Sequence, residues 1–120
     1  LNNAQIGVAS ISLGGVRSQS TLQETLARCR REGLIVIAAA GQIFNTLELK
    51  EPIFPGNSPH TICVAGCYQN LSRPSEGFYG NAVDITAPGW GVIVARTTGN
   101  TPTMTTPNVH CGLLITTVLS

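Results

Sequence analysis

The sequence predicts an α/β fold, with a parallel sheet of about four strands flanked by helices. Three successive segments carry this prediction: a short apolar segment at 6–12, an amphipathic segment after Ser20, and a continuous apolar run at 34–40. A strand, a helix and a second strand in this order form a βαβ unit, which implies parallel pairing and a right-handed crossover. Because a parallel sheet needs cover on both faces, we expect the fold to require more helix than this chain offers.

The predicted helix has recognisable ends. Ser20, with Gln23 three residues later, is typical of a capping box, and Gly33 supplies a stop. Between these ends an apolar stripe recurs at helical spacing, formed by Leu22, Leu26 and Cys29. The run at 34–40 is rich in β-branched residues and is bounded by glycines, which predicts a strand buried on both faces.

The rest of the chain predicts further strands and one more helix. Segments 61–67 and 82–87 indicate short strands, and 92–95 indicates a short strand or an extended arm. The stretch at 41–60 contains three prolines and indicates a loop. At 103–119 threonine and valine favour a strand, but the length and the all-round apolarity favour a buried helix, which we predict.

The composition limits the classes of partner. The net charge is +1, which gives no electrostatic reason to expect nucleic acid or an anionic membrane surface. No apolar run reaches the roughly 18 residues of a membrane span, and the N-terminus lacks the regions of a signal peptide. Charged residues make up 11% of the chain, against about 25% in typical globular proteins. So low a charge favours a buried fold or one that packs against neighbours.

The cysteines do not indicate a cofactor. Cys63 and Cys67 lie on one face of a predicted strand, too far apart to bond to each other. With Cys111 and His110 they form a conceivable zinc set, but the spacing differs from the usual ones. We therefore predict buried free thiols, no metal and no cofactor.

Five segments, in order, resemble motifs of the subtilisin-like serine peptidase family. Residues 10–15 (S-I-S-L-G-G) are similar to N-M-S-L-G-G, and residues 33–42 (G-L-I-V-I-A-A-A-G-Q) to G-V-V-V-V-A-A-A-G-N. Residues 54–55 and 61–66 resemble Y-P followed by V-I-A-V-G-A, and residues 83–89 match V-D-I-x-A-P-G. Residues 100–109 resemble N-G-T-S-M-A-[ST]-P-H-V. Together the segments span nearly the whole chain.

The resemblance implies that residues 1–120 form part of a subtilisin-like domain, its C-terminal half. In the family this half supplies four adjacent parallel strands and the helix that carries the nucleophile. The family's catalytic Asp and His lie upstream, and the matched Asp84 has a structural role. The resemblance also implies a cis peptide bond between Phe54 and Pro55. Typical members are secreted, so any secretion signal is expected upstream of this sequence.

Two positions match catalytic slots of the family with altered residues. Thr103 stands where the family has its nucleophilic Ser, and Pro102 precedes it. Threonine nucleophiles usually depend on an N-terminal amine, and His110 would lie about 10 Å away along a helix. A helix-capping role for Thr103 is the alternative. Gln42 stands in the oxyanion-hole slot, where one additional methylene displaces the carboxamide of the family's Asn.

Two further segments resemble the flanks of the family's substrate cleft. They are Ser12, Leu13 and Gly14, and Ala39, Ala40 and Gly41. Glycines allow a peptide to approach the backbone and pair with it as an added strand. Ordinary strand ends with glycine turns are the alternative interpretation.

These observations leave three functional hypotheses open. The chain is a fragment or degenerate homologue of a subtilisin-like endopeptidase, inactive alone. Alternatively, it is a peptidase half that works only with its N-terminal half, or a pseudopeptidase that binds a peptide or protein through the cleft. Because segment 6–12 would form an exposed sheet edge, we expect the missing N-terminal half or a second copy to pair there.

Overall fold

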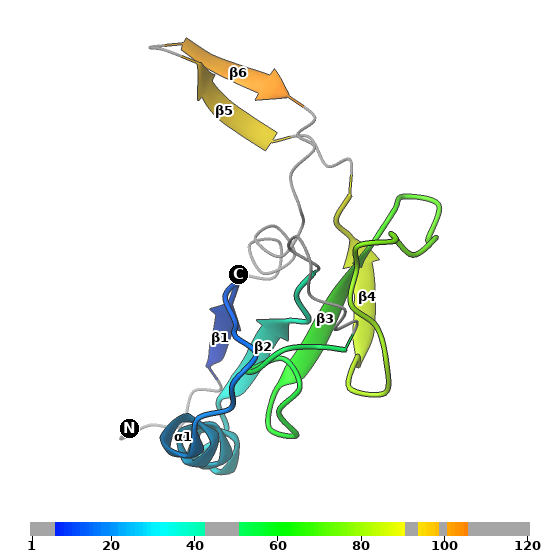
Figure 1. The fold of residues 1–120 in the computed structure, drawn as a ribbon. Helices are drawn as coiled ribbons and strands as arrows, with labels where there is room; N and C mark the ends of the chain where they lie inside the picture. Colours follow the sequence, from blue (N-terminus) through cyan, green and yellow to red (C-terminus); the bar gives the residue numbers. More distant parts are fainter. Residues whose placement is uncertain (1–6, 43–50, 91–93, 99–100, 106–120) are drawn as a thin grey trace.

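A computed structural model describes residues 7–42, 51–90, 94–98 and 101–105 of the chain, the last two ranges by their backbone alone. Along the chain the elements are β1 (Val8–Ile11), α1 (Ser20–Arg31), β2 (Ile35–Ala39), β3 (Ile62–Cys67), β4 (Ile85–Pro88), β5 (Val94–Thr98) and β6 (Thr101–Thr105). Strands β1 to β4 form one parallel sheet in the order β1-β2-β3-β4 (Figure 1). This confirms the predicted α/β class and the four parallel strands, with β1 at one edge.

The N-cap of helix α1 lies one residue earlier in the sequence than predicted. Gln19 is the N-cap because its backbone is extended and its carbonyl accepts the first helical hydrogen bond, from Gln23 N at 3.0 Å. Ser20 is therefore the first helical residue, and the predicted capping box at Ser20 is wrong. Gln19 makes no side-chain cap bond.

The C-terminal stop of α1 is confirmed at Gly33. Its φ of +85° lies in the left-handed region, which a glycine adopts without a steric penalty. The Gly33 and Leu34 N–H groups donate to the carbonyls of Arg30 and Cys29 at 3.2 and 2.9 Å. These two bonds are the Schellman arrangement, which satisfies carbonyls that a helix end otherwise leaves unpaired.

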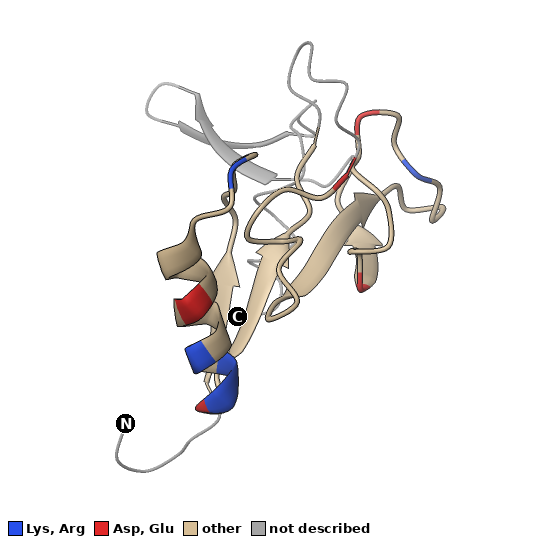
Figure 2. Ribbon diagram, turned by 60° about the horizontal axis from the view of Figure 1, so that its bottom comes forward, with Lys and Arg blue, Asp and Glu red and all other residues tan. Residues whose placement is uncertain are grey.

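Helix α1 covers one face of the sheet, beside β1 and β2 (Figure 2). The cluster between them joins Leu26 of α1, Val36 of β2 and Phe54 of the loop before β3. A second cluster, beneath β3, is formed by Ala40, Cys63, Ala65 and Phe78. No charged residue lies in any of the four strands, whereas α1 carries Arg28, Arg30 and Arg31 in its last turn. The core therefore sits along the middle of the sheet, with the helix charges outside it.

The first residues of the four strands share the opposite face of the sheet. Val8 pairs with Ile35, and because side chains alternate along a strand, the register of β3 and β4 adds Ile62 and Ile85 to the same face. These four side chains are 40–54% exposed. Such a row is unusual in a parallel sheet, whose strands are normally covered on both sides.

The chain from 101 to 105 is a strand and not the start of a helix. Strand β6 pairs antiparallel with β5 in a separate two-stranded sheet. The strand preference of threonine thus prevails at 103–105, where the predicted helix is wrong. The remainder of that prediction, 106–119, lies outside the described residues.

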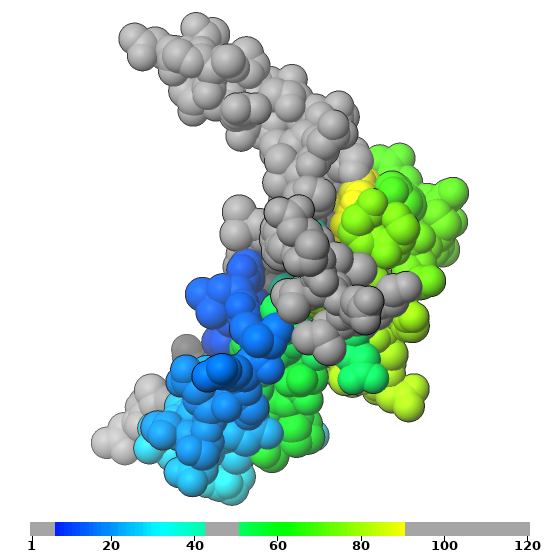
Figure 3. Space-filling model, in the orientation of Figure 1, coloured from blue at the N-terminus to red at the C-terminus, as the bar shows by residue number. Residues whose placement is uncertain are grey.

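Beyond β3, residues 68–82 form a lobe away from α1 (Figure 3). The lobe is tied to the sheet through Phe78, which is buried. Just after the lobe, Asp84 Oδ2 accepts a hydrogen bond of 2.7 Å from Cys63 N in β3. The structural role expected of Asp84 is thereby confirmed. The described residues contain no helix that combines the length and the hydropathy of a membrane span.

Candidate functional site

The two predicted cleft segments meet at the carboxyl end of the sheet. Ser12, Leu13 and Gly14 follow β1, and Ala40 and Gly41 follow the end of β2. In open α/β sheets the carboxyl ends of the strands border the usual ligand crevice. The structure thus brings the two segments to the edge where a substrate would be expected, and their binding role stays a prediction.

The side chain of Ile53 lies between these segments. A Cβ added at Gly14 would be 3.0 Å from Ile53, and one added at Gly41 would be 2.9 Å from it. Gly41 also has a φ of +94°, so two independent constraints require glycine there. Both segments are therefore packed tightly against one aliphatic side chain. The prediction for 41–60 as a plain loop missed Ile53, because an isoleucine among prolines gives no sequence signal.

The backbone around Ile53 is held on both sides. Ile53 N donates to Ala40 O at 3.0 Å, while Gly15 and Phe54 exchange hydrogen bonds of 2.8 and 3.1 Å. The peptide bond between Phe54 and Pro55 is cis, as the resemblance implies. Of the cleft residues, Ala39 and Ala40 are buried and Leu13 is 74% exposed. Leu13 is thus the large side chain that faces solvent at the rim of the cleft.

Gln42, in the predicted oxyanion slot, is buried and 6% exposed. Its backbone forms a bridge with Gly77, which fixes the end of the A-A-A-G-Q segment against the lobe. The Oε1 atom is buried and makes no hydrogen bond within the described part of the chain. A buried carbonyl oxygen without a hydrogen-bond partner is costly.

Thr103, in the predicted nucleophile slot, lies in β6. It belongs to the two-stranded sheet, whereas Gln42 follows the end of β2 in the other sheet. The structure does not place Thr103 at the start of a helix, and the helix-capping alternative for this residue is wrong for the same reason. Thr103 is therefore not a nucleophile positioned at a helix start.

The cysteines of the described chain are free thiols: Cys29, Cys63 and Cys67. No group of three or more His, Cys, Asp or Glu side chains in that part of the chain is arranged to hold a metal ion. Cys111 and His110, the other members of the conceivable zinc set, lie outside it.

Burial, and secondly the charge of Asp84, raise the pKa of Cys63 to about 11. The thiol therefore stays protonated in the folded chain, whereas it ionises near pH 9 when unfolded. Because the unfolded state then binds fewer protons, the free energy of unfolding should fall as the pH rises from about 9 to 11. Urea unfolding at several pH values between about 9 and 11 measures this fall. In the Cys63→Ala variant the free energy of unfolding should depend less steeply on pH. An equal slope in the variant would contradict the assignment.

Comparison with known proteins finds similarity to subtilisin-like proteases. Thermitase of Thermoactinomyces vulgaris is 39% identical over 82 residues, which are 68% of this chain and 28% of that protein. A subtilisin-like protease of Coccidioides posadasii is 35% identical over 103 residues, or 86% of this chain and 25% of the relative. No protein-family profile matches the sequence.

Comparison with solved structures also finds a subtilisin-like protease. The crystal structure of the psychrophilic subtilisin-like protease Apa1 from an Antarctic Pseudoalteromonas superposes with a TM-score of 0.65 at 27% identity. The match covers 74% of this chain and 20% of that structure. The chain thus spans about a quarter of the length of the curated relatives that it matches.

Proposed function

Because this chain belongs to the subtilisin-like serine peptidase family, of which it carries one segment of the fold, we propose that it forms a cleft-bearing part of such a domain and does not hydrolyse peptide bonds by itself. The observation that carries this proposal is the position of Thr103 in strand β6. The nucleophile slot holds a threonine within a strand, so neither the primary hydroxyl of the family's serine nor its helical setting is reproduced.

The acid and base of a triad are also without candidates in the described chain. Asp84 accepts the hydrogen bond of Cys63 N, and His60 lies in the turn that precedes β3. Peptide hydrolysis by serine or threonine needs a base within hydrogen-bond reach of the hydroxyl. Asp84 is engaged with β3, and His60 matches neither the acid nor the base slot of the family, which supports a non-catalytic role for the isolated chain.

The degraded oxyanion slot supports the same proposal. A catalytic donor must reach the developing oxyanion, and the loss of such a donor from a subtilisin lowers the rate by about 10²–10³. The carboxamide of Gln42 is buried, with its oxygen unpaired. It is therefore held inside the fold and not presented at the rim beside Leu13.

A second candidate function is peptide binding through the cleft. Residues 12–14 lie beyond the ladder that joins β1 to β2, so a peptide can pair with them as an added strand. Ile53 occupies the space between Gly14 and Gly41, so that space is not open to a side chain of the peptide. This function requires no catalytic residue.

We expect the purified chain to show no proteolysis and no covalent labelling. Incubation with fluorescent casein and with a fluorophosphonate probe tests this, beside an active subtilisin-like protease as positive control. The expected result is background turnover and no labelled band, because the threonine of the nucleophile slot lies in strand β6 and not at a helix start. Labelling that disappears in Thr103→Ala would overturn the proposal. Activity that appears only after an N-terminal half is added would establish the half-domain alternative instead.

A further inference from the structure

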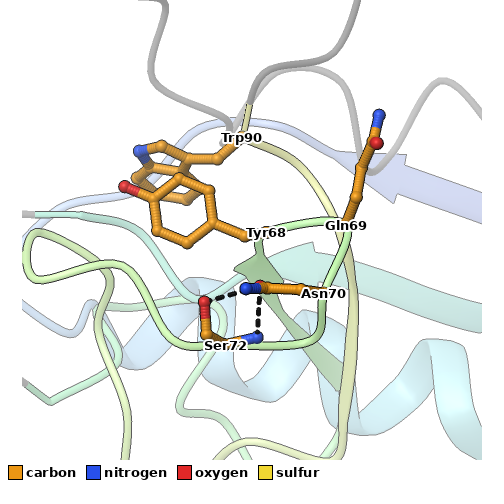
Figure 4. Close-up of a pocket in the computed structure, with 5 residues that line it drawn as sticks. All are labelled: Tyr68, Gln69, Asn70, Ser72 and Trp90. Carbon is orange, nitrogen blue, oxygen red and sulfur yellow. Dashed lines mark hydrogen bonds between the residues drawn. The ribbon is translucent and has the colours of Figure 1, made fainter.

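A pocket outside the cleft lies beside the loop that follows β3. Its lining consists of Tyr68, Gln69, Asn70, Ser72 and Trp90, and its volume is about 560 Å³ (Figure 4). Sites for small ligands usually measure about 300–1,000 Å³ and combine apolar or aromatic walls with a few polar groups. We propose that this pocket binds a neutral saccharide.

The aromatic part of the pocket is a corner made by Tyr68 and Trp90. The ring centroids are 6.4 Å apart and the ring planes meet at 64°. Each ring presents an apolar face and carries a polar group at its tip. A sugar ring has the matching character, because its C–H faces are apolar and its hydroxyls lie around the rim. The corner therefore suits a single sugar unit stacked on one ring and bordered by the other.

The polar part of the pocket is supplied by carboxamides and a hydroxyl. Asn70 Oδ1 accepts hydrogen bonds from Ser72 N at 3.0 Å and from Ser72 Oγ at 2.6 Å (Figure 4). These bonds fix the carboxamide, so its nitrogen is the group left to donate to a ligand. Gln69 adds a second carboxamide, with two N–H donors and a carbonyl acceptor. Sugar hydroxyls both donate and accept, and can use every one of these groups.

The walls of the pocket are formed before any ligand binds. Two backbone hydrogen bonds of 2.9 Å close the turn, from Leu71 N to Tyr68 O and from Tyr68 N to Ser72 O. Leu71 adopts a φ of +65°, which a leucine seldom does. Trp90 packs against the core cluster of Ile37 and Val64. Binding therefore costs little in ordering the site.

The absence of charge in the lining selects between ligand classes. The lining contains no Asp, Glu, His, Lys or Arg side chain. Phosphate or carboxylate ligands favour arginine or lysine, and the nearby Arg73 is already stacked over Tyr79 at 4.1 Å from the ring centroid. A quaternary ammonium would use the ring faces but would leave the carboxamides unpaired. A neutral polyhydroxylated ligand satisfies both walls.

The chain offers its own reporter for this site. Trp90 is its single tryptophan, so intrinsic fluorescence observes this pocket alone. Titration with methyl glucosides, galactosides and mannosides and with N-acetylglucosamine should give a saturable change for at least one sugar, with Kd on the order of 1–10 mM. Tyr68→Ala should weaken that binding about tenfold or more, since stacking is lost. Tyr79→Ala should leave the saccharide affinity unchanged, because Tyr79 is an exposed tyrosine outside the pocket.

Each other outcome overturns the proposal. It fails if no sugar in the panel gives saturation, or if saccharide binding survives Tyr68→Ala in a variant whose circular dichroism matches the parent. It also fails if choline or an acetylated proline pentapeptide saturates the signal while the sugars do not. Amide chemical shifts at residues 68–72 give a second readout that does not depend on Trp90 fluorescence.

Discussion

Replacing Gly56 with alanine should destabilise the chain by about 1–3 kcal/mol. A Cβ at this position would lie 2.5 Å from the carbonyl oxygen of Ala39 and 3.0 Å from that of Ile53. Both neighbours are backbone atoms in the packed centre of the structure, so no side chain can rotate away to make room. The end of β2 and the loop that contains Ile53 and Gly56 would have to separate, which loosens the packing between them.

Gly15→Ala is the matched control for this substitution. A Cβ there meets nothing within 4 Å, and Gly15 is not among the residues with a positive φ. The control should change the free energy of unfolding by less than about 0.5 kcal/mol. Urea unfolding followed by Trp90 fluorescence measures both variants. Equal stability of the two variants would show that the chain near Gly56 is not packed against β2.

Elements with an unambiguous local pattern could be predicted from the sequence. The run at 34–40 becomes β2 because β-branched residues between glycines leave little choice, and Gly33 ends α1 because the Schellman turn needs a left-handed residue. The sheet order also follows, since a βαβ unit restricts how β1 and β2 can pair.

Elements with two competing local preferences could not be predicted. At 103–105 threonine favours a strand, while the apolar tail favours a helix, and pairing with β5 decides the outcome. At the start of α1 both Gln19 and Ser20 precede the apolar stripe, and the backbone of Gln19 supplies the cap. Short-range patterns do not contain the tertiary contacts that settle such cases.

The candidate site shows the same division. The position of the two cleft segments at strand ends could be predicted from their resemblance to the family's motifs, and their binding role stays a prediction. Ile53 could not, since its position between Gly14 and Gly41 depends on how a loop folds back over two strands. The unpaired Oε1 of Gln42 likewise depends on burial, which no residue pattern records.

The isolated chain should associate with itself or with the rest of a subtilisin-like domain. Two features of the sheet lead to this expectation. Strand β1 pairs on one side with β2 and is the edge of the sheet in the described chain. The face opposite α1 carries the half-exposed row of Val8, Ile35, Ile62 and Ile85. Contiguous apolar rows and unpaired edges both recruit partners.

Size-exclusion chromatography with light scattering should therefore find dimers or larger species. The double substitution Ile35→Thr and Ile62→Thr should shift the distribution toward monomer, because threonine keeps the β-branched shape and strand preference but removes apolar area. Leu22→Gln is the matched control, since Leu22 on α1 is 37% exposed, close to the 41% and 40% of the two isoleucines. Because Leu22 lies on the helix and not on the exposed sheet face, Leu22→Gln should leave association unchanged.

A parent chain that is monomeric at high concentration would refute this expectation and show that the row is covered from within. Association that persists in the double variant would move the contact from the face to the edge at β1. Substituting Val8 by Pro then tests the edge. Gly7 O accepts a hydrogen bond from Ile35 N, so Gly7 and Ala9 face β2, whereas the N–H of Val8 points to the free edge and is the donor that proline removes. Ala9 keeps its pairing with Val36 in this variant, so Val36 should keep its burial if the edge alone is disturbed. Loss of association in this last variant, with the fold retained, would identify β1 as the surface on which the rest of the domain assembles.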